Sequence, residues 1–218
     1  MPTTEPGPTP EPPRDCPLCP RLVAYRAENR AAHPDWWNGP APSFGDPDAR
    51  LLVVGLAPGR TGANRTGRPF TGDFAGVLLY QTLIKAGFAR GTYAARPDDG
   101  LTLVDCMISN AVRCAPPGNK PETAEEAACR PFLAARIAAL PRLKVIVTLG
   151  DVARRNVLRA LGLKASAGAG GHGARCDAAG YTLINSYHCS RLNTNTGRLT
   201  PAMFEAVFEA AKAELAAG

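Results

Sequence analysis

The segment APGRTGANRTGRPFTGDFAG, from Ala57 to Gly76, combines glycines and arginines with the aromatic ring of Phe70 and a single carboxylate, Asp73. It joins an apolar run to a run typical of a helix, where a glycine-rich loop commonly binds a phosphate group. The loop lacks both the G-x-x-x-x-G-K-[ST] and the G-x-G-x-x-G patterns of nucleotide-phosphate enzymes. Asp73 can act as a general base toward water or as the N-cap of the next helix.

A second polar segment, HCSRLNTNTGRLTP, begins at His188 and places the apolar Leu192 among polar residues. Such a loop supplies a histidine at a strand end and backbone amides for an anion. Leu192 either forms a wedge between DNA bases or packs into the core. A third polar group, the amide of Asn110, can both donate and accept hydrogen bonds and is expected at the same rim.

Four cysteines form two pairs that could together hold a metal. Cys16 and Cys19 form a C-x2-C pair, and Cys114 and Cys129 lie much further along the chain. Two close and two distant thiolates can build a tetrahedral site, and this ligand count fits zinc or a four-iron cluster. A chance or redox-active C-x2-C pair is the alternative. The other cysteines are predicted to be one core residue, Cys106, and two free thiols, Cys176 and Cys189.

Short apolar runs alternate with helical segments, a pattern that predicts a parallel sheet wrapped by helices. The ligand site of such a fold lies beyond the carboxyl ends of the strands. This rule brings together Ala57–Asp73, Asn110–Cys114 and His188–Thr200. The predicted strands are Arg50–Gly55, Leu101–Ser109, Leu143–Leu149 and Tyr181–Ser186. The predicted helices are Ala75–Ala86, Thr123–Leu140 with a Thr123/Glu126 capping box, Asp151–Leu161, and Pro201–Ala216 with Thr200 as N-cap.

Length and composition indicate one domain with a basic surface. The chain has 218 residues and a net charge of +6, which is compatible with a polyanionic partner. Residues 1–13 are rich in proline and predict a disordered tail, followed by one domain over residues 14–218. We find no signal-peptide pattern and no apolar run of the roughly 20 residues that a membrane span needs. A cytoplasmic protein is therefore expected.

The two long segments resemble the signature motifs of family 5, or type B, uracil-DNA glycosylases. The resemblance rests on GLAPGRTGANRTGRPFTGD and HCSRLNTNTGRLT, with SNAVRCAPPGNKP fitting the segment between them. Family 4 members carry a carboxylate in the first motif, as GEAPG. This chain has Leu56 and Ala57 there, which favours type B.

The resemblance implies a three-layer α/β/α fold around a four-stranded parallel sheet, and a structural four-iron four-sulfur cluster with zinc as the alternative. It implies hydrolysis of the N-glycosidic bond of uracil, hypoxanthine or xanthine in double- or single-stranded DNA, by a nucleoid-associated monomer. The alternatives are a non-catalytic iron–sulfur DNA-binding module and a glycosylase that forms a covalent adduct through His188. The implied cluster ligands are Cys16, Cys19, Cys114 and Cys129.

The resemblance also assigns roles within the motifs. Asp73 addresses the water, His188 donates to the departing base, Asn110 binds the base edge, and Phe70 stacks on the flipped base. Gly59 stands where strictly uracil-specific members carry a bulky tyrosine, so a more open pocket is expected. The remaining base-pocket residues are Gly55 and Ala57. The implied DNA-contacting residues are Arg65, Arg68, Lys120, Arg191, Leu192, Asn193 and Arg198.

Overall fold

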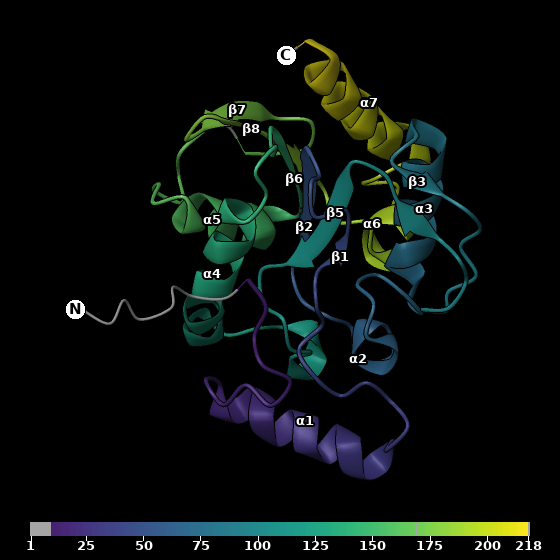
Figure 1. Ribbon diagram of the computed structural model, residues 1–218, viewed down its shortest axis with the longest axis vertical. Coiled ribbons are helices and arrows are strands. Elements are labelled where there is room, and N and C mark those ends of the chain that lie inside the picture. The colour runs from purple at the N-terminus through teal and green to yellow at the C-terminus, as the bar shows by residue number, and fades with distance from the viewer. Residues whose placement is uncertain (1–9, 169, 218) are drawn as a thin grey trace, which may run out of the picture.

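The computed structural model describes residues 10–168 and 170–217, which fold around one central sheet that is packed between helices (Figure 1). The six strands of this sheet run in the order β1-β5-β2-β6-β8-β7, and the inner four are mutually parallel. The outer two pair antiparallel with their neighbours. The strands are β1 (Phe44–Gly45), β2 (Leu51–Gly55), β5 (Cys106–Asn110), β6 (Val145–Leu149), β7 (Arg175–Ala178) and β8 (Tyr181–Ser186).

The sheet is larger than the four strands expected from the sequence. The four predicted strands form its parallel centre, and β1 and β7 extend its two edges. These edge strands are short and only partly buried, so they lack the continuous apolar run that identified the others. The predicted strand Leu101–Ser109 divides into β5 and β4 (Thr102–Leu103), which pairs with β3 (Ala89–Arg90) in a separate two-stranded sheet.

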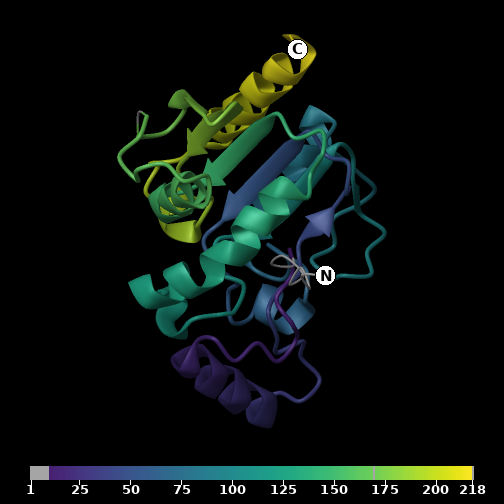
Figure 2. The same cartoon turned by 60° about the vertical axis from the view of Figure 1, so that its left-hand side comes forward.

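Helices cover both faces of the sheet, which confirms the three-layer architecture. On one face, α3 (Phe74–Ala86) and α7 (Pro201–Ala217) bury Leu79 and Phe204 against the strands. On the other, α4 (Thr123–Ala138) and α5 (Asp151–Ala160) bury Leu133. Figure 2 shows α4 lying across the sheet with α7 behind it. Strands β2, β5 and β6 are therefore buried along their whole length.

The helix ends follow capping chemistry, with one correction. Helix α3 ends at Gly87 in the left-handed conformation, and the hydroxyl of Thr200 accepts from Met203 N at the start of α7, both as predicted. The predicted Thr123/Glu126 capping box is wrong by one residue. The box is formed by Glu122 and Glu125, whose carboxylate accepts from Glu122 N at 2.7 Å.

Three further helices were not predicted from the sequence. Helix α1 (Pro20–Ala32) follows the first cysteine pair, and α2 (Ala63–Thr66) and α6 (Arg191–Asn195) lie inside the two motif segments. The last two are short, mostly polar helices, which carry no apolar periodicity. Among the described residues, no helix has the length and apolar character needed to cross a membrane.

The packed part of the chain begins before residue 14. Most of the predicted tail, residues 1–9, lies outside the described residues. Further on, the carboxylate of Glu11 accepts from Arg113 at 3.1 Å and from Arg136 at 2.6 Å. Since the Arg113 side chain is buried, this contact holds the end of the predicted tail against the domain.

Candidate active site

A cavity of about 310 Å³ opens at the carboxyl ends of β2 and β5. All three polar segments predicted from the sequence reach it, which confirms that they converge at this edge of the sheet. A volume of this size suits a small ligand held among apolar and polar side chains. Its lining includes Leu56, Ala57, Pro58, Gly59, Arg60, Thr61, Phe70, Asp73, Phe74, Ala75, Asn110, Asn119, His188, Ser190 and Arg191.

One wall of the cavity is built by Phe70 and Asn110 packed against Gly55. A Cβ atom on Gly55 would lie 2.5 Å from both the Phe70 ring and Asn110 Oδ1, so only glycine admits both side chains. Asn110 is 2% exposed, and its Oδ1 has no hydrogen-bond partner within the described chain. A buried acceptor of this kind is costly unless a ligand donates to it.

Asp73 divides its two carboxylate oxygens between the fold and the cavity. Oδ1 accepts from Gly76 N at 3.2 Å, so the N-cap predicted as one alternative is confirmed. Oδ2 faces Gly59 and Gly62, where an added Cβ would collide with or crowd the carboxylate. Burial raises the pKa of Asp73, and backbone hydrogen bonds oppose that rise. Capping therefore leaves one oxygen of this residue available at the cavity.

His188 faces Phe70 across the cavity, with 6.1 Å between the ring centroids. Burial lowers the pKa of His188 from its ordinary value of 6.5, which keeps the imidazole neutral at neutral pH. The same side chain also borders a second cavity of about 370 Å³, which lies over the ends of β6 and β8 and is lined in part by Arg154 and Arg198.

The second motif forms the rim, and its predicted DNA-contacting residues have different surroundings. Leu192 is 72% exposed, which excludes the alternative that it packs into the core. Arg191 lies over Phe74, and Arg198 over Tyr187, with both guanidinium groups on exposed residues. The Asn193 amide instead donates to the backbone oxygen of His188 at 2.8 Å, and so it braces the loop.

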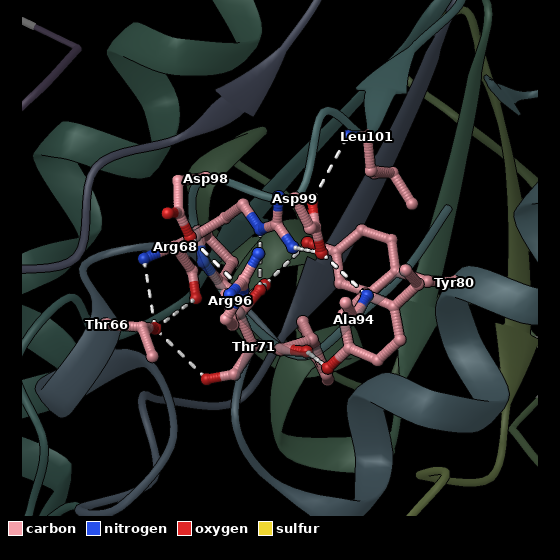
Figure 3. A network of polar contacts seen from close by, with 12 residues as sticks. Thr66, Arg68, Thr71, Tyr80, Ala94, Arg96, Asp98, Asp99 and Leu101 are labelled. Atoms are coloured by element: carbon pink, nitrogen blue, oxygen red, sulfur yellow. Dashed lines mark hydrogen bonds and ion pairs between the residues drawn. The ribbon is translucent and has the colours of Figure 1, made fainter. Parts of the chain in front are cut away.

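The first motif places Arg65 and Arg68 in opposite environments. Arg65 is exposed on α2, and Lys120 is exposed beyond β5, as a phosphate contact requires. Arg68 is only 5% exposed and forms a bidentate ion pair with Asp99 (Figure 3). The prediction that Arg68 contacts DNA is therefore wrong. Its charge is already paired inside the protein, and the guanidinium cannot reach a phosphate.

Sequence reasoning missed several residues of the cavity. Arg60 lines it and donates through Nε to Asn29 of α1 at 2.8 Å. Asn119 reaches it from the short helical turn Pro117–Asn119, and Ser190 from the N-cap of α6. All three residues lie inside the segments that resemble the family motifs, and this position was the one sign of a functional role. Nothing in the local pattern showed which polar side chains of those segments face inward.

The four paired cysteines meet at a second location, between α1 and the start of α4. Cys16, Cys19, Cys114 and Cys129 line one small cavity with apolar walls that include Leu22, Val112 and Phe132. Within residues 10–168 and 170–217, no three histidine, cysteine or acidic side chains are arranged so that they could hold a single metal ion.

Nearby groups donate hydrogen bonds to two of these sulfur atoms. Arg26 lies 3.8 Å from Cys114 Sγ, and the Arg113 backbone amide donates to Cys129 Sγ at 3.3 Å. Burial raises the pKa of Cys114 to about 12 and of Cys129 to about 11.

The remaining cysteines agree with their predicted roles. Cys106 is fully buried within β5, which confirms it as a core residue. Cys176 and Cys189 are free thiols, and Cys189 is also fully buried.

Comparison with known proteins places the chain in a family. The model of the uracil DNA glycosylase superfamily matches residues 42–212. The chain is 47% identical to the type-5 uracil-DNA glycosylase of Thermus thermophilus, over 90% of this chain and 92% of that protein. It is 41% identical to the type-5 enzyme of Pyrobaculum aerophilum, over 92% and 89%. It is 31% identical to the type-4 enzyme of that organism, over 70% and 64%. The chain therefore belongs to the uracil-DNA glycosylase superfamily, as an enzyme of the type-5 family.

Proposed function

We propose that this enzyme removes uracil, hypoxanthine and xanthine from DNA by hydrolysing the N-glycosidic bond, and leaves an abasic site. The observation that carries the proposal is one cavity that gathers an aromatic ring, an unpartnered amide oxygen, a carboxylate and a neutral imidazole. Together these groups can hold a planar base and assist the loss of that base from its sugar. The named activity of the type-5 relatives supports the same reaction.

Base recognition would depend on Phe70 and Asn110. A base inside a duplex is out of reach, so the nucleotide must turn out into the cavity, where Phe70 stacks on it. Asn110 Oδ1 can then accept from a ring N–H of the base. Deamination of cytosine or adenine converts a ring nitrogen from an acceptor into a donor. An unpartnered acceptor at this point therefore favours uracil and hypoxanthine over their parent bases.

In the chemical step, His188 and Asp73 would stabilise charges of opposite sign. Cleavage leaves negative charge on the departing base and positive charge on the sugar. A neutral His188 can donate to the base oxygen as its charge grows. The oxygen of Asp73 that does not cap α3 can orient the attacking water and stabilise the cationic sugar. Histidine then acts as a donor, and no covalent adduct with the protein is required.

A broad substrate range would follow from Gly59. A Cβ atom placed there meets Asp73 Oδ2 at 3.1 Å and has little else around it. No side chain at this position narrows the cavity, which leaves room for the two-ring bases as well as uracil. Four exposed cations on the surface would contact DNA phosphates, and Leu192 would occupy the space of the displaced base. The four are Arg65, Lys120, Arg191 and Arg198.

A glycosylase assay tests the proposal. The enzyme is incubated with duplex oligonucleotides that contain uracil, hypoxanthine or xanthine, and the abasic sites are then cleaved with alkali. We expect strand cleavage with each base, and a drop of about 100-fold or more in single-turnover rate for Asp73→Asn. Asparagine is itself a favoured N-cap, so this variant removes the charge while keeping the cap and the thermal stability. Full activity of Asp73→Asn would leave Asp73 with the capping role alone, and a wild type inactive on all three bases refutes the proposal.

The pH profile tests the protonation states. Asp73 must be ionised, and its folded pKa lies above 3.8; His188 must be neutral, and its folded pKa lies below 6.5. Both groups therefore lose their active form as the pH falls, and the single-turnover rate should decline from neutral pH toward pH 4. In Asp73→Asn the remaining decline reports His188. A rate that rises as the pH falls below neutral would instead identify a cationic imidazole as the donor.

Gly55→Ala tests the packing of the cavity wall. The added methyl group would displace Phe70 or Asn110, so we expect kcat/KM for uracil to fall by at least about tenfold. Overpacking should also lower the free energy of unfolding by about 1–3 kcal/mol. Gly170→Ala is the matched control, since its methyl group would meet Arg154 at 4.0 Å, outside the lining of this cavity, and should spare activity on uracil. Equal losses in both variants would contradict this account of the wall.

The same proposal includes a four-iron four-sulfur cluster held by Cys16, Cys19, Cys114 and Cys129. Four cysteines line one apolar cavity, and hydrogen-bond donors lie beside two of their sulfur atoms. This arrangement fits an iron–sulfur cluster held by four thiolates. The cluster would tie the N-terminal segment and α1 to the chain that follows β5 and to α4. A structural role is enough to explain this position, because the cysteines are absent from the lining of the base cavity.

Iron and sulfide analysis of protein purified without oxygen tests the cluster. We expect a brown protein with about four irons per chain, and loss of colour and iron in Cys114→Ser together with a lower Tm. Cys176→Ser, which changes a free thiol elsewhere, should keep both colour and iron. A colourless wild type that holds one zinc would show the alternative metal to be correct.

A further inference from the structure

The backbone of Phe70 adopts an unusual conformation at the point where its ring forms the wall of the base cavity. Its φ angle is +52°, in the left-handed region that a bulky aromatic residue rarely occupies. Such a conformation persists only when the surroundings hold it in place. The ring is 7% exposed and packs on Gly55, so this backbone geometry fixes where the ring lies in the cavity wall.

The residues on either side of Phe70 are held by hydrogen bonds from other elements. The Tyr80 hydroxyl of α3 donates to Pro69 O at 2.7 Å, and the Tyr93 hydroxyl donates to Phe70 O at 3.1 Å. Arg68 Nε donates to the Thr71 hydroxyl at 2.7 Å, and that hydroxyl in turn donates to Pro69 O. Each carbonyl around the strained residue is therefore fixed by a buried or half-buried side chain.

An ion pair between Arg68 and Asp99 lies at the centre of these contacts (Figure 3). Two parallel hydrogen bonds of 2.8 Å join them, and the Asp99 side chain is 1% exposed. Asp99 also accepts from the backbone amides of Ala94 and Leu101. Arg68 holds the pKa of Asp99 well below its usual range. The pair thus connects the first motif to the loop of residues 93–101.

Three aromatic rings enclose the Arg68 guanidinium and restrict it further. The ring of Phe44 from β1 lies 5.2 Å from it, and those of Tyr80 and Tyr93 lie 5.3 and 5.9 Å away. A buried ion pair adds little net stability compared with apolar residues of the same volume, because both charges lose their hydration. What such a pair supplies is a defined geometry, since its fork of hydrogen bonds permits few alternatives.

We propose that Arg68, Asp99 and Tyr93 are positioning residues of the base pocket, which act through Phe70 by holding it in the left-handed conformation. The inference rests on the proposed function, because it requires Phe70 to stack on the flipped base. It makes the loop of residues 93–101, which lies outside both motif segments, part of substrate recognition.

The main test removes both charges together, in Arg68→Met/Asp99→Asn. Methionine fills the volume of the stem, and asparagine keeps an acceptor for one of the two backbone amides, so the Tm should fall only modestly. We expect the single-turnover rate on uracil-containing duplex to fall about tenfold, with DNA binding unchanged. Asp98→Asn is the matched control, since this neighbouring carboxylate is exposed and pairs with Arg96, which is also exposed.

A double-mutant cycle with Phe70→Leu separates positioning from general damage. If the pair acts through Phe70, adding Arg68→Met/Asp99→Asn to Phe70→Leu should change the rate by less than about twofold. Losses that multiply across the two backgrounds would overturn the inference. The cycle compares active proteins, so a wild type without glycosylase activity would refute the proposed function instead.

Tyr93→Phe provides an independent variant should the charge-pair variant fail to fold. It removes one hydroxyl that donates to Phe70 O and leaves the ring over Arg68. We expect a smaller loss of rate in the wild-type background and none in Phe70→Leu. An unchanged rate for Tyr93→Phe, or an equal loss in both backgrounds, would also overturn the inference.

Discussion

The register between β2 and β5 is the constraint on which the rest of the site depends. It pairs Gly55 with Asn110 at the last position of both strands, so the two residues lie side by side at the carboxyl edge of the sheet. Because Gly55 has no side chain, the Asn110 amide and the Phe70 ring can both occupy the space above it. A slip of one residue would turn every buried side chain of the strand to the opposite face. The apolar core and the geometry of the cavity are thus specified by the same pairing.

Much of this arrangement could be predicted because it follows from patterns that are local in the sequence. The central strands are apolar runs, and the rule that ligands bind at their carboxyl ends brings Asp73, Asn110 and His188 together. The edge strands and the single-turn helices could not be predicted, because backbone pairing and short-range turns create them without an apolar pattern. The misplaced capping box has a similar cause. Glu125 is also held by Arg21 of α1, a long-range contact that no local pattern contains.

Arg68 shows why the role of a charge is harder to predict than its presence. In sequence it is one of several arginines in a motif that was expected to face DNA, and composition gives no reason to separate it from Arg65. The difference comes from Asp99, which lies far outside the motif and whose own neighbour Asp98 is exposed. Only the folded chain shows that one guanidinium is neutralised inside the protein while the other remains available to a phosphate.

The cysteine site and the base cavity are separate, yet the chain connects them in two places. Asn110 is followed within a few residues by Val112, Arg113 and Cys114, so the strand that ends at Asn110 runs directly into the cysteine cavity. Helix α1, which begins next to Cys19, presents Asn29 to Arg60 at the cavity lining. Whatever fixes the four cysteines therefore also fixes α1 and the loop after β5. A structural cluster could support catalysis through these contacts without touching the substrate.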